Sequence, residues 1–217
     1  PLQFESAEDL EKYPRTPERD IELSEKYGVT HLWMPSYKDI YPEGFSKLSA
    51  GPIANLYEGA SRPGHFDGVV TVVRRLFDLV KPRVAIFGEK DFQQLALIKQ
   101  IDSGVRIITA PTIRESDGLA LSSRNIRLDA DARMAATVIS RALLLATRQN
   151  DFDSARATLN EILATEPALT VDYAQIIDEK DFSQATDAST HARAIVAGWI
   201  NGIRLIDNMS MKTGAQS

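Results

Sequence analysis

Short apolar runs and longer helical repeats alternate along the first half of the chain. In residues 66–80 the apolar side chains recur every three or four positions, and this period predicts an amphipathic helix. Residues 84–87 and 105–110 are short apolar runs typical of buried strands, and residues 93–101 between them have helical character. Strands that alternate with helices in this way predict an α/β fold with a parallel, Rossmann-like sheet.

The start of the chain extends this alternation. Thr16 followed by Pro17 and acidic residues predicts a helix that ends near Gly28. The apolar run at residues 29–34 then predicts a further buried strand. Residues 46–64 are rich in glycine and proline and predict a loop, which is either a plain connector or a segment that covers a site.

The pattern changes after residue 112. Two Ala- and Leu-rich helices are predicted, at residues 130–147 and 154–165. Three apolar runs follow, and an Asn-Gly pair typical of a hairpin turn separates the last two. The runs predict strands at residues 171–178, 192–200 and 203–208. We therefore expect a Rossmann-like domain at residues 1–112 and a small α+β domain at residues 113–217.

The turn after the apolar run 84–87 collects a glycine, a cation and several polar groups. Open α/β sheets bind ligands at such strand ends. Gly88 lets a ligand approach the backbone, and Lys90 can meet a phosphate or carboxylate at the start of a helix. Asp91 and Gln94 also match a variant of the capping box, in which both side chains bind backbone amides. The turn therefore indicates either an anion site or a helix cap.

Composition narrows the classes of partner. A formal net charge of -5 and a pI near 5.3 argue against a nucleic-acid surface but allow a local cationic pocket. The chain contains no cysteine, which excludes disulfides and thiolate chemistry and fits a reducing compartment. With neither an apolar run of membrane-spanning length nor a signal-peptide pattern, we expect a cytoplasmic protein without a membrane partner. Because Pro1 stands where a methionine normally begins a chain, we expect a fragment or a processed start.

A second cationic loop lies at residues 114–125. Ser122, Ser123 and Arg124 place two hydroxyl groups beside a guanidinium group, and these donors suit phosphate oxygens in a phosphoryl or nucleotidyl transition state. A serine-rich turn with a solvent-facing arginine explains the same residues equally well.

These motifs together resemble those of the bacterial pantothenate synthetases. The similar segments follow the family's order along the chain: Pro1-Leu2-Gln3-Phe4, Tyr13-Pro14-Arg15-Thr16, Arg62-Pro63-Gly64-His65-Phe66, residues 88–94 and residues 117–125. The resemblance implies a Rossmann-like domain followed by a small C-terminal domain. It also implies that ATP and Mg²⁺ are used to adenylate (R)-pantoate with release of diphosphate. The amine of β-alanine then attacks the adenylate to give pantothenate and AMP.

The resemblance also implies roles for single residues. Gln94 is expected to bind pantoate, and Gln3 to orient pantoate beside the β-alanine site. The residues expected to stabilise the phosphate charge during catalysis are Lys90, Ser122, Ser123 and Arg124. The expected ATP contacts are Gly88, Glu89, Lys90, Asp91, Ile113, Leu121, Ser122, Ser123 and Arg124.

Further implications concern the metal, the partner and a missing motif. Mg²⁺ is assigned to the ATP phosphates, with Asp20 as a candidate protein ligand that its neighbour Arg19 makes doubtful. His65 is given a structural hydrogen bond rather than a catalytic role. The resemblance implies a homodimer. The family's His-x-Gly-His motif, which binds ATP phosphates and supplies a proton donor, does not occur in these 217 residues. The resemblance thus implies that the Rossmann-like domain at residues 1–112 lacks its first part, and we expect this chain alone to be inactive.

Two other function classes stay open. One is a non-catalytic module that binds nucleotide or pantoate, or assists assembly, without performing chemistry. The other is a different nucleotidyltransferase of the same superfamily. The glutamine pair Gln3 and Gln94 favours the pantoate activity over the latter, because two amides suit a small hydroxy acid.

Overall fold

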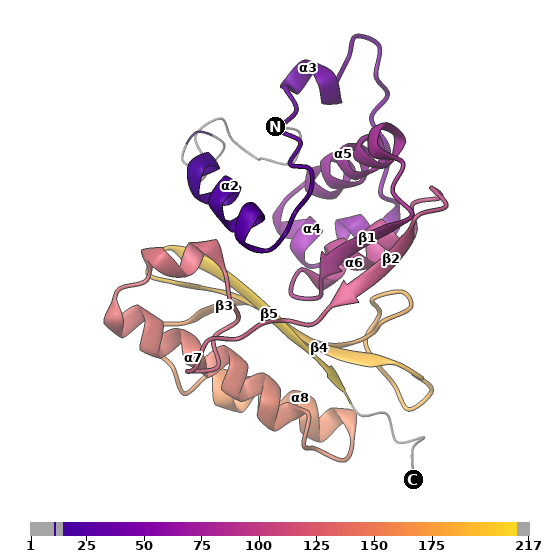
Figure 1. The fold of residues 1–217 in the computed structure, drawn as a ribbon. Helices are drawn as coiled ribbons and strands as arrows, with labels where there is room; N and C mark the ends of the chain where they lie inside the picture. The colour runs from indigo at the N-terminus through magenta and orange to yellow at the C-terminus, as the bar shows by residue number, and fades with distance from the viewer. Residues whose placement is uncertain (1–10, 12–14, 212–217) are drawn as a thin grey trace.

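The computed structural model describes Glu11 and residues 15–211. An N-terminal part with a parallel strand pair lies against a C-terminal part with an antiparallel sheet, as Figure 1 shows. The chain therefore has the mixed α/β fold that the sequence predicts. Within the described residues, no helix combines the length and apolar character needed to cross a membrane.

The N-terminal part is built around the parallel strands β1 and β2. Their register runs from the pair Val84 and Arg106 to the pair Gly88 and Ala110. The elements of this part are α2 (Pro17–Lys26), α3 (Tyr37–Ile40), η1 (Pro52–Asn55), α4 (Glu58–Ser61), α5 (His65–Val80), β1 (Val84–Gly88), α6 (Phe92–Lys99) and β2 (Arg106–Ala110). The predicted helix at residues 66–80 and the predicted sequence of strand, helix and strand after it are confirmed.

One face of the strand pair packs on α5 and α6. Ala85, Phe87 and Ile107 contact the buried side chains of those helices, including Phe77. The other face is open among the described residues, and Ile86 is 67% exposed. The strand predicted at residues 84–87 forms, but the prediction that it is buried is wrong, because the described helices cover the pair on one side only.

Residues 29–34 follow an irregular path instead of the predicted strand. A strand needs a neighbour for its backbone hydrogen bonds, and none of the described strands pairs with this segment. Its apolar side chains are exposed as a result, including Trp33 and Met34. In contrast, α2 forms as predicted, with Thr16 at the N-cap position and Pro17 in the first turn, although the Thr16 side chain makes no capping hydrogen bond.

The C-terminal part is a three-stranded sheet with two helices on one face. The elements are η2 (Ser123–Arg127), α7 (Ala130–Ala146), α8 (Phe152–Leu163), β3 (Thr170–Asp178), β4 (Ala192–Ile200) and β5 (Ile203–Met211). The strands pair in the order β3-β4-β5. Asp129 and Asp151 fix the starts of the two long helices, because each side chain accepts a hydrogen bond from a first-turn amide. The helices and strands predicted here are confirmed.

The hairpin between β4 and β5 turns at Asn201 and Gly202. Their φ angles are 48° and 72°, the left-handed values that both central residues of a type I′ turn require. This turn pairs Ile200 with Ile203 and sets the antiparallel register of the two strands. The hairpin predicted from the Asn-Gly pair is confirmed, and it brings β5 alongside the buried β4.

The two faces of the C-terminal sheet pack on different partners. One face carries the main core against α7 and α8, as Figure 1 shows, with Leu143, Leu159 and Val196 fully buried. On the other face, Ile177 and Ile195 form a second apolar cluster with side chains from η1 and α6. This second cluster joins the two parts of the molecule and places the turn between β1 and α6 against the sheet.

Candidate active site between the parallel strands and the C-terminal sheet

The turn at residues 88–91 connects the end of β1 to the start of α6. The amide of Glu89 donates to the carbonyl oxygen of Ala110 at 2.8 Å, so the turn leaves the sheet beside the end of β2. Asp91 occupies the N-cap position, but among the described residues its side chain makes no capping hydrogen bond. The capping box predicted for Asp91 and Gln94 is therefore wrong, because Asp91 meets the helix through its carbonyl oxygen, which accepts from the Leu95 amide at 2.9 Å, and not through its side chain.

A polar pocket lies beside this turn. Lys90, Gln94 and His65 all contribute to its lining, and the ring of Phe92 and the side chain of Ile195 supply apolar surface. The pocket thus combines a cation, an amide and an imidazole with a hydrophobic surface, which is the usual make-up of a site for a small polar ligand. Two residues expected from the sequence, Lys90 and Gln94, are brought together here.

A second pocket adjoins the first on the other side of Lys90. Ser122 and Arg124 line it, together with buried Asn125. Lys90 lines both the pocket with Gln94 and the pocket with the serine loop, so the two pockets share this residue. The two motifs that the sequence separates by about thirty positions therefore converge on one cation.

The serine loop is held from within the C-terminal part. Asn125 donates to the carbonyl oxygen of Ala120 at 3.1 Å and to Glu115 at 2.8 Å. Arg133 on α7 pairs with Glu115 at 2.6 Å. The hydrogen bond from Arg133, and to a smaller extent the one from Asn125, holds the pKa of Glu115 below its ordinary value. The loop therefore has a fixed base, while Arg124 at its tip is exposed.

The two apolar residues expected at the ATP site also meet. The amide of Leu121 donates to the carbonyl oxygen of Ile113 at 2.8 Å, so the two ends of the loop lie side by side. Both side chains face outward, with Ile113 63% exposed and Leu121 55% exposed. Exposed apolar side chains beside the serine loop give an apolar surface on which a nucleotide base can lie.

An open groove continues from the serine loop toward α4. Four arginines line it: Arg62, Arg124, Arg127 and Arg204. Arg204 makes ion pairs with Glu58 on α4 and with Asp172 on β3. Burial alone would raise the pKa of Asp172, but hydrogen bonds from Arg204 and Ser61 outweigh it and lower that pKa. The paired acids leave the groove with an excess of positive charge, which suits an anionic ligand.

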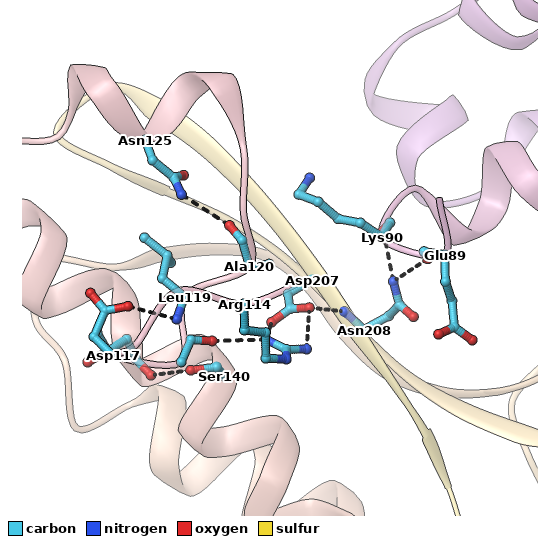
Figure 2. A network of polar contacts seen from close by, with 12 residues as sticks. Glu89, Lys90, Arg114, Asp117, Leu119, Ala120, Asn125, Ser140, Asp207 and Asn208 are labelled. Carbon is cyan, nitrogen blue, oxygen red and sulfur yellow. Dashed lines mark hydrogen bonds and ion pairs between the residues drawn. The ribbon is translucent and has the colours of Figure 1, made fainter. Parts of the chain in front are cut away.

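Buried polar residues of the C-terminal sheet hold the turn that carries Lys90. Arg193 on β4 pairs with Glu89 at 2.8 Å and with Glu179 at 2.8 Å. On β5, Asn208 donates to the carbonyl oxygens of Glu89 and Lys90, as Figure 2 shows. The side chain of Glu89, expected to contact ATP, is therefore engaged within the protein instead.

A neighbouring ion pair anchors the serine loop to the same strand. Arg114 binds Asp207 through both of its terminal nitrogens, at 2.6 and 2.9 Å, and also donates to the carbonyl oxygen of Gly118 (Figure 2). Arg193, Asp207 and Asn208 are not among the residues predicted from the sequence. A signal was present, since charged and amide side chains inside strands that are otherwise apolar must find partners when they are buried.

Three further candidates have different outcomes. Gln3 lies outside the described residues. Asp20 lies on α2 and accepts a hydrogen bond from the Thr16 hydroxyl at 3.3 Å. Within the described parts of the chain, no three His, Cys, Asp or Glu side chains come close enough to hold a metal ion. The His65 ring lies in the pocket, with its Nε2 atom 3.1 Å from a terminal nitrogen of Arg62.

Comparison with known proteins gives one consistent result. Residues 1–210 match the family model described as pantoate-beta-alanine ligase. A pantothenate synthetase of Chlorobium luteolum is 42% identical over 98% of this chain and 79% of its own length. One from Mycolicibacterium smegmatis is 44% identical over 100% of this chain and 71% of its own length.

Solved structures agree with the sequence matches. The crystal structure of pantothenate synthetase from Thermus thermophilus superimposes with a TM-score of 0.89 at 43% identity, covering 96% of this chain and 79% of that one. A pantoate-beta-alanine ligase from Francisella tularensis, complexed with beta-gamma ATP and beta-alanine, gives a TM-score of 0.75 at 35% identity. That match covers 97% of this chain and 76% of that one.

Proposed function

The chain belongs to the pantoate-beta-alanine ligase family, and we propose that it carries the machinery for condensing (R)-pantoate with β-alanine at the expense of ATP. The pantoate carboxylate attacks the α-phosphorus of ATP, and diphosphate leaves. The β-alanine amine then attacks the acyl carbon of the pantoyl adenylate, and AMP leaves as the amide bond forms. The observation that carries this proposal is the position of Lys90 between the Gln94 pocket and the serine loop.

The ATP phosphates are assigned to the space between the two motifs. Lys90 supplies a compact cation there, and the hydroxyl groups of Ser122 and Ser123 act as donors beside the Arg124 guanidinium. Ser122 accepts a hydrogen bond from the Arg124 amide at 3.2 Å, so its own proton is available to a phosphate oxygen. Positioned donors of this kind stabilise charge that develops on the transferring phosphate.

The nucleoside is assigned to the ends of the serine loop and to the turn after β1. Ile113 and Leu121 offer apolar surface and backbone groups to the adenine ring, since their amide and carbonyl already lie side by side. Gly88 ends β1 with no side chain, and no atom outside its chain neighbours lies within 4 Å of the place where a Cβ would stand, so a ribose has room beside the exposed Asp91. We assign Glu89 to the ATP site only through its backbone, because Arg193 holds its side chain.

Pantoate is assigned to the pocket that Gln94 lines. The Gln94 amide can donate to a carboxylate or hydroxyl oxygen and accept from a hydroxyl proton, which matches a small hydroxy acid. Gln3 is proposed as the second amide, which contacts pantoate and β-alanine. The polar side chains of the same pocket then orient the carboxylate toward the phosphates near Lys90.

The metal, the assembly and the compartment complete the proposal. We assign Mg²⁺ to the ATP phosphates, which it neutralises during transfer, rather than to Asp20, because Asp20 belongs to no group of three possible metal ligands among the described residues. A homodimer and a cytoplasmic location are proposed from membership of the family and from the cysteine-free composition.

The 217-residue chain alone is proposed to bind its substrates without turning them over. Its sequence contains no His-x-Gly-His motif to stabilise the transferring phosphate. Incubation of the chain with ATP, Mg²⁺, pantoate and β-alanine should therefore yield no pantothenate by mass spectrometry. Pantothenate that accumulates in proportion to the amount of chain would contradict this part of the proposal.

Calorimetric titration tests the binding site directly. We expect a non-hydrolysable mimic of pantoyl adenylate to bind the chain and to compete with ATP. Changing Lys90→Ala should weaken ATP binding about tenfold or more, because one charge-assisted contact to phosphate contributes about 1.5–3 kcal/mol. Lys99→Ala, at the exposed end of helix α6 that follows the turn, is the matched control and should leave binding unchanged.

The pantoate assignment separates this function from that of other nucleotidyltransferases. Gln94→Ala should weaken the mimic and pantoate while ATP affinity is retained, and the control Gln100→Ala at the end of α6 should change neither. Equal losses for pantoate and ATP would count against the role of Gln94. A chain that binds ATP but neither pantoate nor the mimic would favour a different nucleotidyltransferase or a non-catalytic nucleotide-binding module.

A further inference from the structure

Asn208 is a buried amide on β5 that faces the backbone of the Lys90 turn. It is 5% exposed. Its Nδ2 atom donates to the carbonyl oxygen of Lys90 at 2.8 Å and to that of Glu89 at 3.1 Å. One side chain therefore holds two successive peptide groups of the turn, from a position 118 residues further along the chain.

Arg193 fixes the orientation of this amide. Its Nη1 atom donates to the Oδ1 atom of Asn208 at 2.7 Å, so the amide nitrogen must point toward the turn. The Arg193 guanidinium also lies 4.0 Å from the centroid of the Phe92 ring, and its remaining nitrogens pair with Glu89 and Glu179. The donor of Asn208 is thus held in place by a residue that is itself 5% exposed.

The side chain of Lys90 extends away from Asn208 toward the segment that carries Ala120, as Figure 2 shows. Its direction depends on the peptide plane from which it starts, and Asn208 binds the carbonyl of that residue. A shift of this peptide plane would therefore displace the ammonium group of Lys90 relative to the two pockets that the residue lines. A displacement of about 1 Å at a reacting group is enough to reduce activity by about a hundredfold.

We propose that Asn208 is a positioning residue that sets the direction of the Lys90 ammonium group toward the ATP phosphates. This inference rests on the proposed function, because it takes Lys90 as the phosphate contact. The sequence resemblance assigns no role to Asn208. The interaction also makes the C-terminal sheet a part of the ATP site, although Asn208 itself lies behind the turn.

Asn208→Asp is the variant that separates positioning from packing. The carboxylate has the same shape and still accepts from Arg193, but it has no proton to donate and repels the two carbonyl oxygens. We expect ATP binding, measured by calorimetry with Mg²⁺ present, to weaken about tenfold. Asn160→Asp makes the same chemical change at an exposed amide that donates to the carbonyl oxygen of Arg156 on α8, and it should leave ATP affinity unchanged.

A double-mutant cycle shows whether the effect passes through Lys90. In a Lys90→Ala background, Asn208→Asp should cause no further loss of ATP affinity, because the group that it positions is gone. An equal tenfold loss in that background would overturn the proposal, as would unchanged ATP affinity in the single variant. If Asn208→Asp does not fold, Asn208→Ala takes its place in the same cycle.

Hydrogen exchange provides a measurement without ligand. Amides of residues 88–92 should exchange faster in Asn208→Asp than in the wild type, while those of residues 192–197 on β4 keep their rates. Unchanged exchange in the turn would overturn the proposed positioning. A wild-type chain that does not bind ATP would refute the proposed function instead, and the exchange rates would then decide whether Asn208 holds the turn.

Discussion

Replacing Asp207 with asparagine removes the charge from an enclosed ion pair beside the candidate site. The carboxylate is 5% exposed and receives both terminal nitrogens of Arg114, at 2.6 and 2.9 Å. It also accepts the backbone amide of Asn208 at 2.8 Å. In Asp207→Asn the shape is kept, but the new amide nitrogen must face one guanidinium N–H group, and that donor loses its acceptor.

The size of the effect follows from the burial of the two partners. Removing one partner of a fully buried ion pair costs about 3–5 kcal/mol, because the other charge is left without compensation. Arg114 is 24% exposed, so water can partly solvate its guanidinium, and we expect the lower value of about 2–3 kcal/mol. For a protein of this size, that loss lowers the melting temperature by about 4–12 °C.

Urea denaturation followed by circular dichroism measures this loss. The matched control is Asp153→Asn, because Asp153 pairs with Arg156 at 2.6 Å but is 97% exposed. Exposed pairs contribute little, so the control should change stability by about 0.5 kcal/mol or less. If the two variants lose the same free energy of unfolding, burial does not set the strength of the Arg114–Asp207 pair and the reasoning is refuted.

Three other changes test the fold and its pH dependence. The pKa of Glu115 lies below its ordinary value of 4.5, so its stabilising interaction with Arg133 is present above that pH and is lost as the pH falls through the lowered pKa. The difference in melting temperature between the wild type and Glu115→Gln should therefore shrink in acid. Leu143→Ala should cost about 2–5 kcal/mol in urea denaturation, and its 45% exposed neighbour Leu144→Ala much less. Gly202→Ala should cost about 1 kcal/mol by the same assay, because its φ is +72°.

The elements that could be predicted from the sequence are those with a strong local period. The helix α5 has an apolar stripe that repeats over sixteen residues, and its neighbours β1 and β2 are apolar runs with clear ends. The hairpin between β4 and β5 was equally local, because Asn201 and Gly202 have positive φ angles, which asparagine and glycine adopt more readily than other residues. Such signals depend on residues a few positions apart, so they remain visible without the tertiary structure.

The predictions that failed depended on neighbours that local patterns do not contain. Residues 29–34 have the composition of a strand, but a strand also needs a paired edge, and none of the described strands supplies one. The exposure of Ile86 has the same origin, since an apolar run does not reveal how many of its faces are covered. The turn at Asp91 has the spacing of a capping box, but the backbone holds the helix start without that side chain.

The candidate site also combines features that the sequence can predict with features that it cannot. The chemical groups can be predicted, but the contacts that orient them cannot. The sequence names groups that can bind a phosphate, such as Lys90 and Arg124, because chemistry and local spacing are enough to suggest them. It does not show what holds them, since Glu89 meets Arg193 across 104 positions. An arginine within an otherwise apolar strand nevertheless predicts that a buried partner exists, because a buried charge without one is too costly. Polar residues inside the C-terminal strands are therefore the positions at which the sequence indicates contacts to the site, and Asn208 is the clearest of them.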